Sequence, residues 1–198
     1  MYIVRMDFED APAATKGSIF QLLSFIFKKH EARCVLVGGY ALIANKVQRM
    51  TFDIDFILTP EDYSKIEPDL FKAGYSVLSR QKAFVQLKNG KRGMRDLDFL
   101  IGDQETISGL IAQGKTISIA GEPFIVPSPM HLIAMKLHSM VNNKNRESKD
   151  LPDVINLMIS HSIDPAGSEI REMFRKYNAM HLMDKIIQTP GLQNNDKI

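Results

Sequence analysis

The stretch Gly38-Gly39-Tyr40-Ala41, followed by Thr51-Phe52-Asp53-Ile54-Asp55-Phe56-Ile57-Leu58, decides the fold. The apolar run at 34–37 predicts a short strand that ends in the two glycines, and residues 40–45 predict a short helix. Residues 51–58 predict a second strand, whose two carboxylates point to one face, about 6.5 Å apart along the chain. A glycine turn lets backbone N–H groups approach an anion, and two neighbouring carboxylates are stabilised by a divalent cation.

Outward from this stretch, helical and strand patterns alternate as far as Pro127. Helices are predicted at 16–30, 59–73 and 104–112, and strands at 75–78, 83–87, 94–101, 115–120 and 123–126. From Ser128 only helical patterns follow, at 128–141, 150–160, 167–177 and 179–188, with a polar loop at 142–149 and a frayed tail from Thr189. We therefore expect an α/β core over residues 1–127 and a C-terminal helical part over 128–198.

The composition excludes several classes of protein. A hydrophobic fraction of 44% is typical of a globular chain, and no apolar run is long enough to predict a membrane span. The acidic N-terminal residues argue against a secretory signal, and the single cysteine, Cys34, cannot support a disulfide framework. A reducing, cytoplasmic setting is expected. A formal net charge of +2 is too small to indicate nucleic-acid binding from global electrostatics.

A second pair of carboxylates, Asp96 and Asp98, lies on the predicted strand 94–101. Together with Asp53 and Asp55, one of these acids would complete a carboxylate triad, which suits the shared ligation of two divalent cations. A glycine pair after a strand is most often only a turn, and an alternating Asp-x-Asp is most often a solvent-facing strand. The order and spacing of the two motifs together favour an active site.

These motifs resemble those of a known family. Gly38-Gly39, then Arg49-x-Thr51-x-Asp53-x-Asp55, then Asp98 in a Leu-Asp-Phe-Leu strand are similar to the nucleotidyltransferase superfamily, which has the DNA polymerase beta-like fold. The later patterns Pro127-Ser128-Pro129-x-x-Leu132-x-x-x-Lys136-Leu137 and Arg146-x-x-Lys149-Asp150-x-x-Asp153 resemble its bacterial abortive-infection, AbiEii-like toxin branch. The resemblance covers roughly residues 33–160 and implies a mixed sheet flanked by helices. One departure is Gly39, where many family members have a phosphate-binding serine.

The resemblance implies a transfer of a nucleoside monophosphate from a nucleoside triphosphate to an acceptor hydroxyl, on an RNA end such as that of a tRNA or on a protein. It implies Mg²⁺, with Mn²⁺ as the alternative, and an antitoxin as partner if the enzyme is a toxin. By the same resemblance, Asp53, Asp55 and Asp98 would be the catalytic and metal-binding residues. The nucleotide would be bound by the residues Gly38, Gly39, Arg49, Thr51 and Lys136, with Lys149 as a looser candidate.

Two alternatives stay open at this point. Asp96 shares a strand face with Asp98 and is the rival for the third carboxylate. The second alternative is a catalytically inactive member of the fold that binds a nucleotide or a partner protein.

Overall fold

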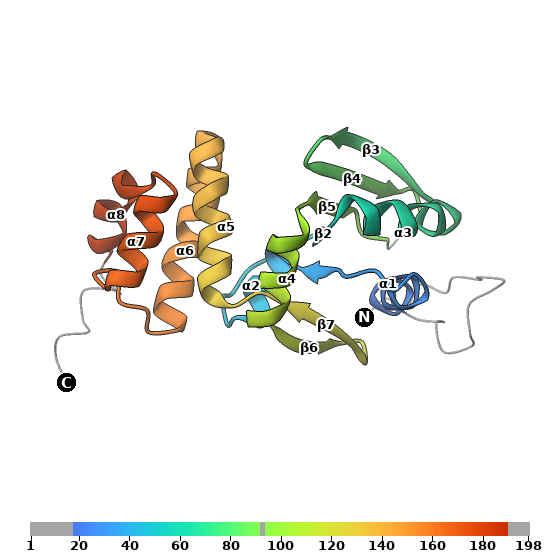
Figure 1. The fold of residues 1–198 in the computed structure, drawn as a ribbon, viewed down its shortest axis with the longest axis horizontal. Coiled ribbons are helices and arrows are strands. Elements are labelled where there is room, and N and C mark those ends of the chain that lie inside the picture. The colour runs from blue at the N-terminus through green and yellow to red at the C-terminus, as the bar shows by residue number, and fades with distance from the viewer. Residues whose placement is uncertain (1–17, 92–93, 190–198) are drawn as a thin grey trace. The chain divides into compact units, whose positions relative to one another are not determined.

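The computed structural model describes residues 18–91 and 94–189, which form two compact units (Figure 1). One is a sheet unit, which includes the chain up to Ala41 and Met50–Pro127; the other is a helical unit, made of Leu42–Arg49 and the chain from Ser128 onward. Residues 16–17 of the predicted helix 16–30, and the predicted tail after Thr189, lie outside the described residues; the described part of this helix begins at Ile19, with Ser18 as its N-cap.

The sheet unit holds a seven-stranded mixed sheet in the order β3-β4-β5-β2-β1-β7-β6. Its elements are α1 (Ile19–Lys29), β1 (Val35–Leu36), the start of α2 (Gly38–Ala44), β2 (Ile54–Leu58), α3 (Pro60–Lys72), β3 (Tyr75–Gln81), β4 (Phe84–Asn89), β5 (Leu97–Ile101), α4 (Gln104–Gln113), β6 (Lys115–Ile119) and β7 (Glu122–Val126). The pairs β2–β5 and β1–β7 are parallel, and the other neighbouring pairs are antiparallel. The mixed sheet flanked by helices is the fold that the sequence predicted.

Alternation along the two central strands separates the core from the polar face. Phe56 of β2 and Phe99 of β5 are fully buried and stack on one another at 6.0 Å between ring centroids. Phe27 of α1 meets Phe56 edge to face, and Tyr63 of α3 does the same to Phe99. Helices α1 and α3 therefore cover this face, while the alternate residues of both strands point to the other face.

The helical unit consists of α5 (Pro129–Asn142), the short 3-10 helix η2 (Lys144–Arg146), α6 (Glu147–Ser160), α7 (Ser168–Lys176) and α8 (Met180–Ile187). Helix α5 packs against α6 and α7 packs against α8 (Figure 1). The hydroxyl of Ser128 accepts a hydrogen bond from the His131 N–H and caps α5, as the Ser-Pro start predicts. Segment 42–49 is tied to the end of α6 by the His161 ring, which lies 2.9 Å from the Asn45 carbonyl.

Several predicted boundaries are wrong. Helix α2 begins at Gly38 and not at residue 40, so the glycines form its first turn. Strand β2 begins at Ile54 and β5 at Leu97, so Asp53 and Asp96 each lie just ahead of a strand and not within it. The predicted loop at 142–149 contains η2 and the first turn of α6.

Of the helices in residues 18–91 and 94–189, none combines the length and the apolar character that a membrane crossing needs.

Candidate active site

Three carboxylates converge on the polar face of the sheet. Asp55 of β2 lies directly opposite Asp98 of β5 in the parallel pair, and Asp53 comes from the bend that leads into β2. Each of the three offers one carboxylate oxygen, and these oxygens all lie within 4.8 Å of one another. Oxygens at this spacing can share one or two hard divalent cations, for which carboxylates are the preferred protein ligands.

Asp98 is the most buried member of the group. Its side chain is buried, and its Oδ1 atom has no hydrogen-bond partner among the described residues. Burial, and then the negative charges of Asp55 and Asp53, raise the pKa of Asp98 to about 6, against a hydrogen bond from Gln86 that lowers it. A buried, unpaired oxygen beside two further carboxylates is an environment that a bound cation would relieve, so the donor set fits a divalent metal.

The glycine turn lies against this group. Gly38 has a φ of +59°, and a Cβ at this position would lie 1.9 Å from Asp55 Oδ2. Only glycine combines this backbone conformation with so close an approach. A Cβ on Gly39 would lie 2.4 Å from Cβ of Thr51, which explains why the serine of many family members has no room here.

A cavity of about 470 Å³ opens beside the carboxylates. Its lining residues are Phe52, Asp53, Gln86, Met94, Arg95 and Asp96. Asp96 therefore faces this cavity and is not in the carboxylate group, which contains Asp98. Phe52 is 77% exposed, so the cavity has an apolar, accessible ring next to Asp53.

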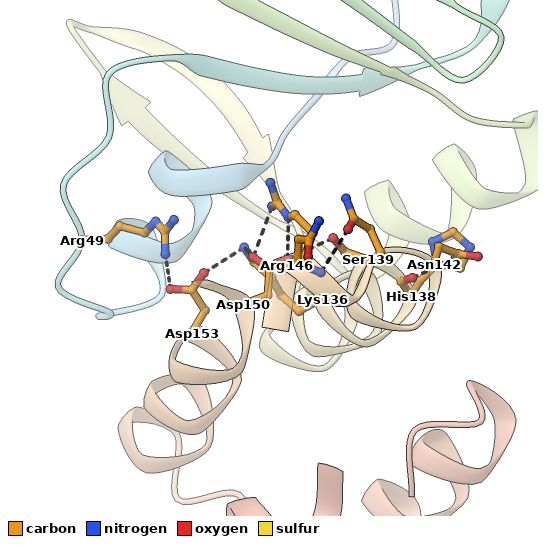
Figure 2. Close-up of polar contacts among 10 residues, drawn as sticks. Arg49, Lys136, His138, Ser139, Asn142, Arg146, Asp150 and Asp153 are labelled. Carbon is orange, nitrogen blue, oxygen red and sulfur yellow. Dashed lines mark hydrogen bonds and ion pairs between the residues drawn. The ribbon is translucent and has the colours of Figure 1, made fainter. Parts of the chain in front are cut away.

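Arg49 and Lys136, expected at the nucleotide, are ion-paired with carboxylates inside the helical unit. Lys136 Nζ lies 2.7 Å from Asp150 and 2.8 Å from Asp153, and Arg49 pairs with Asp153 (Figure 2). Arg146 and the Ser139 hydroxyl complete the contacts of the fully buried Asp150. Lys149 is exposed. The nucleotide contacts of Arg49, Lys136 and Lys149 stay predictions.

Asp53 and Asp96 are the cavity-lining residues that the sequence motifs singled out, whereas Phe52, Gln86, Met94 and Arg95 were not identified. Gln86 is brought to Asp98 by the antiparallel register of β4 with β5, which no local pattern reveals. Phe52 directly precedes Asp53, and Arg95 directly precedes Asp96. This adjacency to the motif acids is the feature of the sequence from which both could have been proposed. The roles of Asp150 and Asp153 were also missed, although their Asp-x-x-Asp spacing puts both on one face of a helix.

Comparison with known proteins agrees with this geometry. Residues 21–197 match the family model described as nucleotidyl transferase AbiEii toxin, type IV TA system. Among curated protein sequences no relative matches.

Solved structures share the fold at low sequence identity. The structure of ANT(2")-Ia in complex with adenylyl-2"-tobramycin is 18% identical, with a TM-score of 0.59 over 82% of this chain and 96% of that one. An antigenic nucleotidyltransferase-like protein from Paracoccidioides brasiliensis is 15% identical, with a TM-score of 0.58 over 89% and 91% of the two chains. The lincosamide antibiotic adenylyltransferase LnuA, lincomycin-bound, is 17% identical, with a TM-score of 0.50 over 70% and 93%.

The family match spans most of the sequence and agrees with the mixed sheet and with its carboxylate face. The chain therefore belongs to the nucleotidyl transferase AbiEii toxin family of type IV toxin–antitoxin systems, and it is a nucleotidyltransferase that uses a nucleoside triphosphate.

Proposed function

We propose that the protein transfers a nucleoside monophosphate to an acceptor hydroxyl in a Mg²⁺-dependent reaction centred on Asp53, Asp55 and Asp98. The observation that carries this proposal is the convergence of the three carboxylates, with ligand oxygens within 4.8 Å of one another. Mn²⁺ fits the same oxygen donors and is the alternative ion. When bound, the cation would neutralise charge on the phosphates and lower the pKa of the attacking hydroxyl.

Each residue has a task in this reaction. Asp53 and Asp55 would hold the cation, and Asp98 would hold it as well and take the proton of the acceptor hydroxyl. The acceptor oxygen forms a bond to the α-phosphorus, the bond from that phosphorus to the bridging oxygen breaks, and pyrophosphate leaves.

The order of the strands separates the two sides from which substrates could approach the carboxylates. Across neighbouring strands, Gln86 of β4 pairs with Asp98 of β5, Asp98 pairs with Asp55 of β2, and the Asp55 carbonyl accepts the Val37 N–H just ahead of Gly38. The glycines thus lie at one end of this row, and Gln86, which lines the cavity, lies at the other. Phosphoryl transfer places the attacking and leaving oxygens in line, on opposite sides of the phosphorus.

We assign the two ends accordingly. The backbone at Gly38 and Gly39 would hold the β- and γ-phosphates, because the first N–H groups of a helix lack partners within that helix. The acceptor would then approach from the cavity side, past Phe52 and Gln86. Phe52 offers a flat ring on which an acceptor base can stack.

The acceptor that we propose is a hydroxyl on an RNA end, including that of a tRNA, or on a protein. One structural neighbour is described in complex with adenylyl-2"-tobramycin and another as a lincosamide antibiotic adenylyltransferase, so tobramycin is a useful comparison acceptor. We further propose that the activity is toxic to the host cell and is controlled by an antitoxin partner, because the matched family is one of toxins.

Label transfer tests the proposed reaction. The protein is incubated with each of four α-³²P nucleoside triphosphates and Mg²⁺, and with total RNA, cell protein or tobramycin as the acceptor. We expect label on RNA or protein, none from γ-labelled triphosphate, and none with Asp55→Asn or with a chelator. Equal labelling by Asp55→Asn and wild type would contradict the assignment of the carboxylates.

Growth tests the toxin proposal separately. Induced expression of the wild-type chain should arrest growth, whereas Asp55→Asn expressed to the same level should not. Co-expression of an antitoxin encoded beside the gene should restore growth. Normal growth with active, labelled enzyme would refute toxicity and leave the transfer reaction intact.

A further inference from the structure

Asp53 differs from the other two carboxylates in how it is held. Asp55 and Asp98 are in β2 and β5, where the ladder of the parallel pair fixes their direction. Asp53 lies in the bend ahead of β2, which starts at Ile54. Its side chain therefore needs support from outside the ladder to reach the shared position.

That support comes from Thr51. The Thr51 hydroxyl donates a hydrogen bond of 2.9 Å to Asp53 Oδ1 and lies 3.2 Å from the Asp53 carbonyl oxygen. An ionised carboxylate only accepts hydrogen bonds and has further lone pairs, so this contact orients Asp53 and leaves capacity for a cation.

Thr51 is itself held from two sides. Arg95 Nη1 donates to the Thr51 carbonyl oxygen at 3.0 Å, and the Arg95 guanidinium lies over the Tyr40 ring, 5.8 Å from its centroid. On the other side the Thr51 side chain fills the space that a Cβ on Gly39 would need, at 2.4 Å from Thr51 Cβ and 2.5 Å from Oγ1. Gly39 is in helix α2, where alanine is normally favoured over glycine, so this packing is the reason for the glycine.

We propose that Thr51 is a positioning residue whose hydroxyl orients Asp53 for the divalent cation, with Gly39 giving its side chain room and Arg95 holding its backbone. The proposal rests on the proposed function, and it gives Thr51 a contact with Asp53 in place of the nucleotide contact that the family resemblance implies. Outer-sphere partners of this kind change metal affinity by about 10–100-fold when they are removed.

Binding of Mn²⁺ to the metal-free protein, measured by calorimetry and by electron paramagnetic resonance, tests this role without an activity assay. Thr51→Val keeps the shape of the side chain and removes the hydroxyl, so we expect Mn²⁺ affinity to fall about 10–100-fold. Thr51→Ser keeps the hydroxyl and should stay within about threefold of wild type. If Thr51→Val binds Mn²⁺ as wild type does, the proposal is overturned while the metal site stands. If the wild-type protein binds no Mn²⁺, the proposed function fails as well.

A second variant guards against misfolding of Thr51→Val. Gly39→Ala keeps the hydroxyl and displaces the Thr51 side chain, so Mn²⁺ affinity should again fall about tenfold or more. In the double variant Gly39→Ala/Thr51→Gly, the crowding is relieved but the hydroxyl is absent. We expect its unfolding temperature to recover relative to Gly39→Ala, with Mn²⁺ affinity still low. Wild-type affinity in the double variant would overturn the proposal.

Discussion

At the scale of single residues, the site places a buried carboxylate beside two other negatively charged groups. Asp98 is 8% exposed and faces Asp55 and Asp53, and this environment raises its pKa to about 6. In the unfolded chain the pKa of an aspartate carboxyl group is about 3.9. Since the folded state binds more protons between these two values, the metal-free protein loses stability as the pH rises from about 4 to above 6.

Replacing Asp98 should therefore stabilise the metal-free protein. At pH 7.5 we expect Asp98→Asn to unfold at a temperature roughly 5–10 °C above wild type, because a penalty on the order of 2–3 kcal/mol is removed. At pH 4 the difference should largely vanish, since wild-type Asp98 is then protonated. Calorimetric scans at both pH values, with a chelator present, measure this. A variant that is less stable than wild type at pH 7.5 would contradict the like-charge account.

Phe52 provides a second residue-scale prediction. If the acceptor stacks on this ring, Phe52→Ala should raise the KM for the acceptor about tenfold, because stacking contributes about 1–3 kcal/mol. The KM for the triphosphate and the unfolding temperature should stay near wild type. Phe71→Ala, on α3 and 41% exposed, is a matched control that should change neither KM. An unchanged acceptor KM in Phe52→Ala would place the acceptor elsewhere.

The acids of the site could be predicted from the sequence, but not their complete surroundings. Asp53, Asp55 and Asp98 were found because their spacing is local or repeated on a second strand-like pattern. Gln86 could not be found, because its place opposite Asp98 depends on the register of β4, which long-range pairing sets. The contact of Arg95 with the Thr51 carbonyl, just ahead of the bend that contains Asp53, could not be predicted either, because it joins residues 44 positions apart.

At the scale of elements, buried charge joins α5 to α6. Asp150 and Asp153 of α6 are both buried, and Lys136 of α5 contacts both, with its own side chain 12% exposed (Figure 2). Burial of such groups is tolerated only while each charge is paired. The predicted loop at 142–149 was wrong for this reason: its polar residues suit a solvent-exposed loop, yet Arg146 binds Asp150 and the first turn of α6 forms there.

Removing the positive charge of Lys136, which pairs with both Asp150 and Asp153, should destabilise the fold. Lys136→Met keeps the length of the side chain and leaves two buried carboxylates with fewer partners, so we expect a loss of about 3 kcal/mol in the free energy of unfolding. Lys149→Met, on the exposed surface of α6, should change it by less than about 0.5 kcal/mol. Urea titrations of both variants measure this. If Lys136→Met and Lys149→Met had equal free energies of unfolding, the ion-pair network would not stabilise the packing of α5 against α6.

The contact between α1 and α3 should depend on pH. Asp69 of α3 accepts hydrogen bonds from Lys29, Lys72 and the His30 ring, and Lys29, followed by His30 and Lys72, holds the pKa of Asp69 well below its usual range. The contribution to stability is complete above about pH 4, the unfolded pKa, and is lost as the pH falls below it.

We expect Asp69→Asn to lower the free energy of unfolding on the order of 1 kcal/mol at pH 6, because the lysines are partly exposed and the pairing is screened. The difference from wild type should shrink as the pH is lowered towards 2. Glu105→Gln, on the exposed side of α4, is a control that should show no such trend. A deficit that stays constant with pH would contradict the ion-pair explanation.

At the scale of the whole molecule, the order of elements could be predicted because turn residues and caps separate them along the chain. Thr59 and Ser128 cap α3 and α5 as their positions ahead of proline predict. The assignment of segment 42–49 to the helical unit could not be predicted, because it depends on contacts such as that of His161 with the Asn45 carbonyl, over a hundred residues away. Local sequence patterns therefore predict where helices and strands begin and end, whereas contacts between distant residues determine which compact unit a segment belongs to.

The carboxylate face of the sheet is where the metal and the triphosphate should meet. A crystal of the wild-type protein grown with Mn²⁺ and a non-hydrolysable triphosphate, measured at the manganese absorption edge, locates the ion by its anomalous signal. We predict an anomalous peak within about 2.0–2.3 Å of oxygens from Asp53, Asp55 and Asp98, with the triphosphate extending from it towards Gly38. A manganese peak elsewhere, or nucleotide density with no ion at these three carboxylates, would contradict the assignment of Asp53, Asp55 and Asp98 as the metal site.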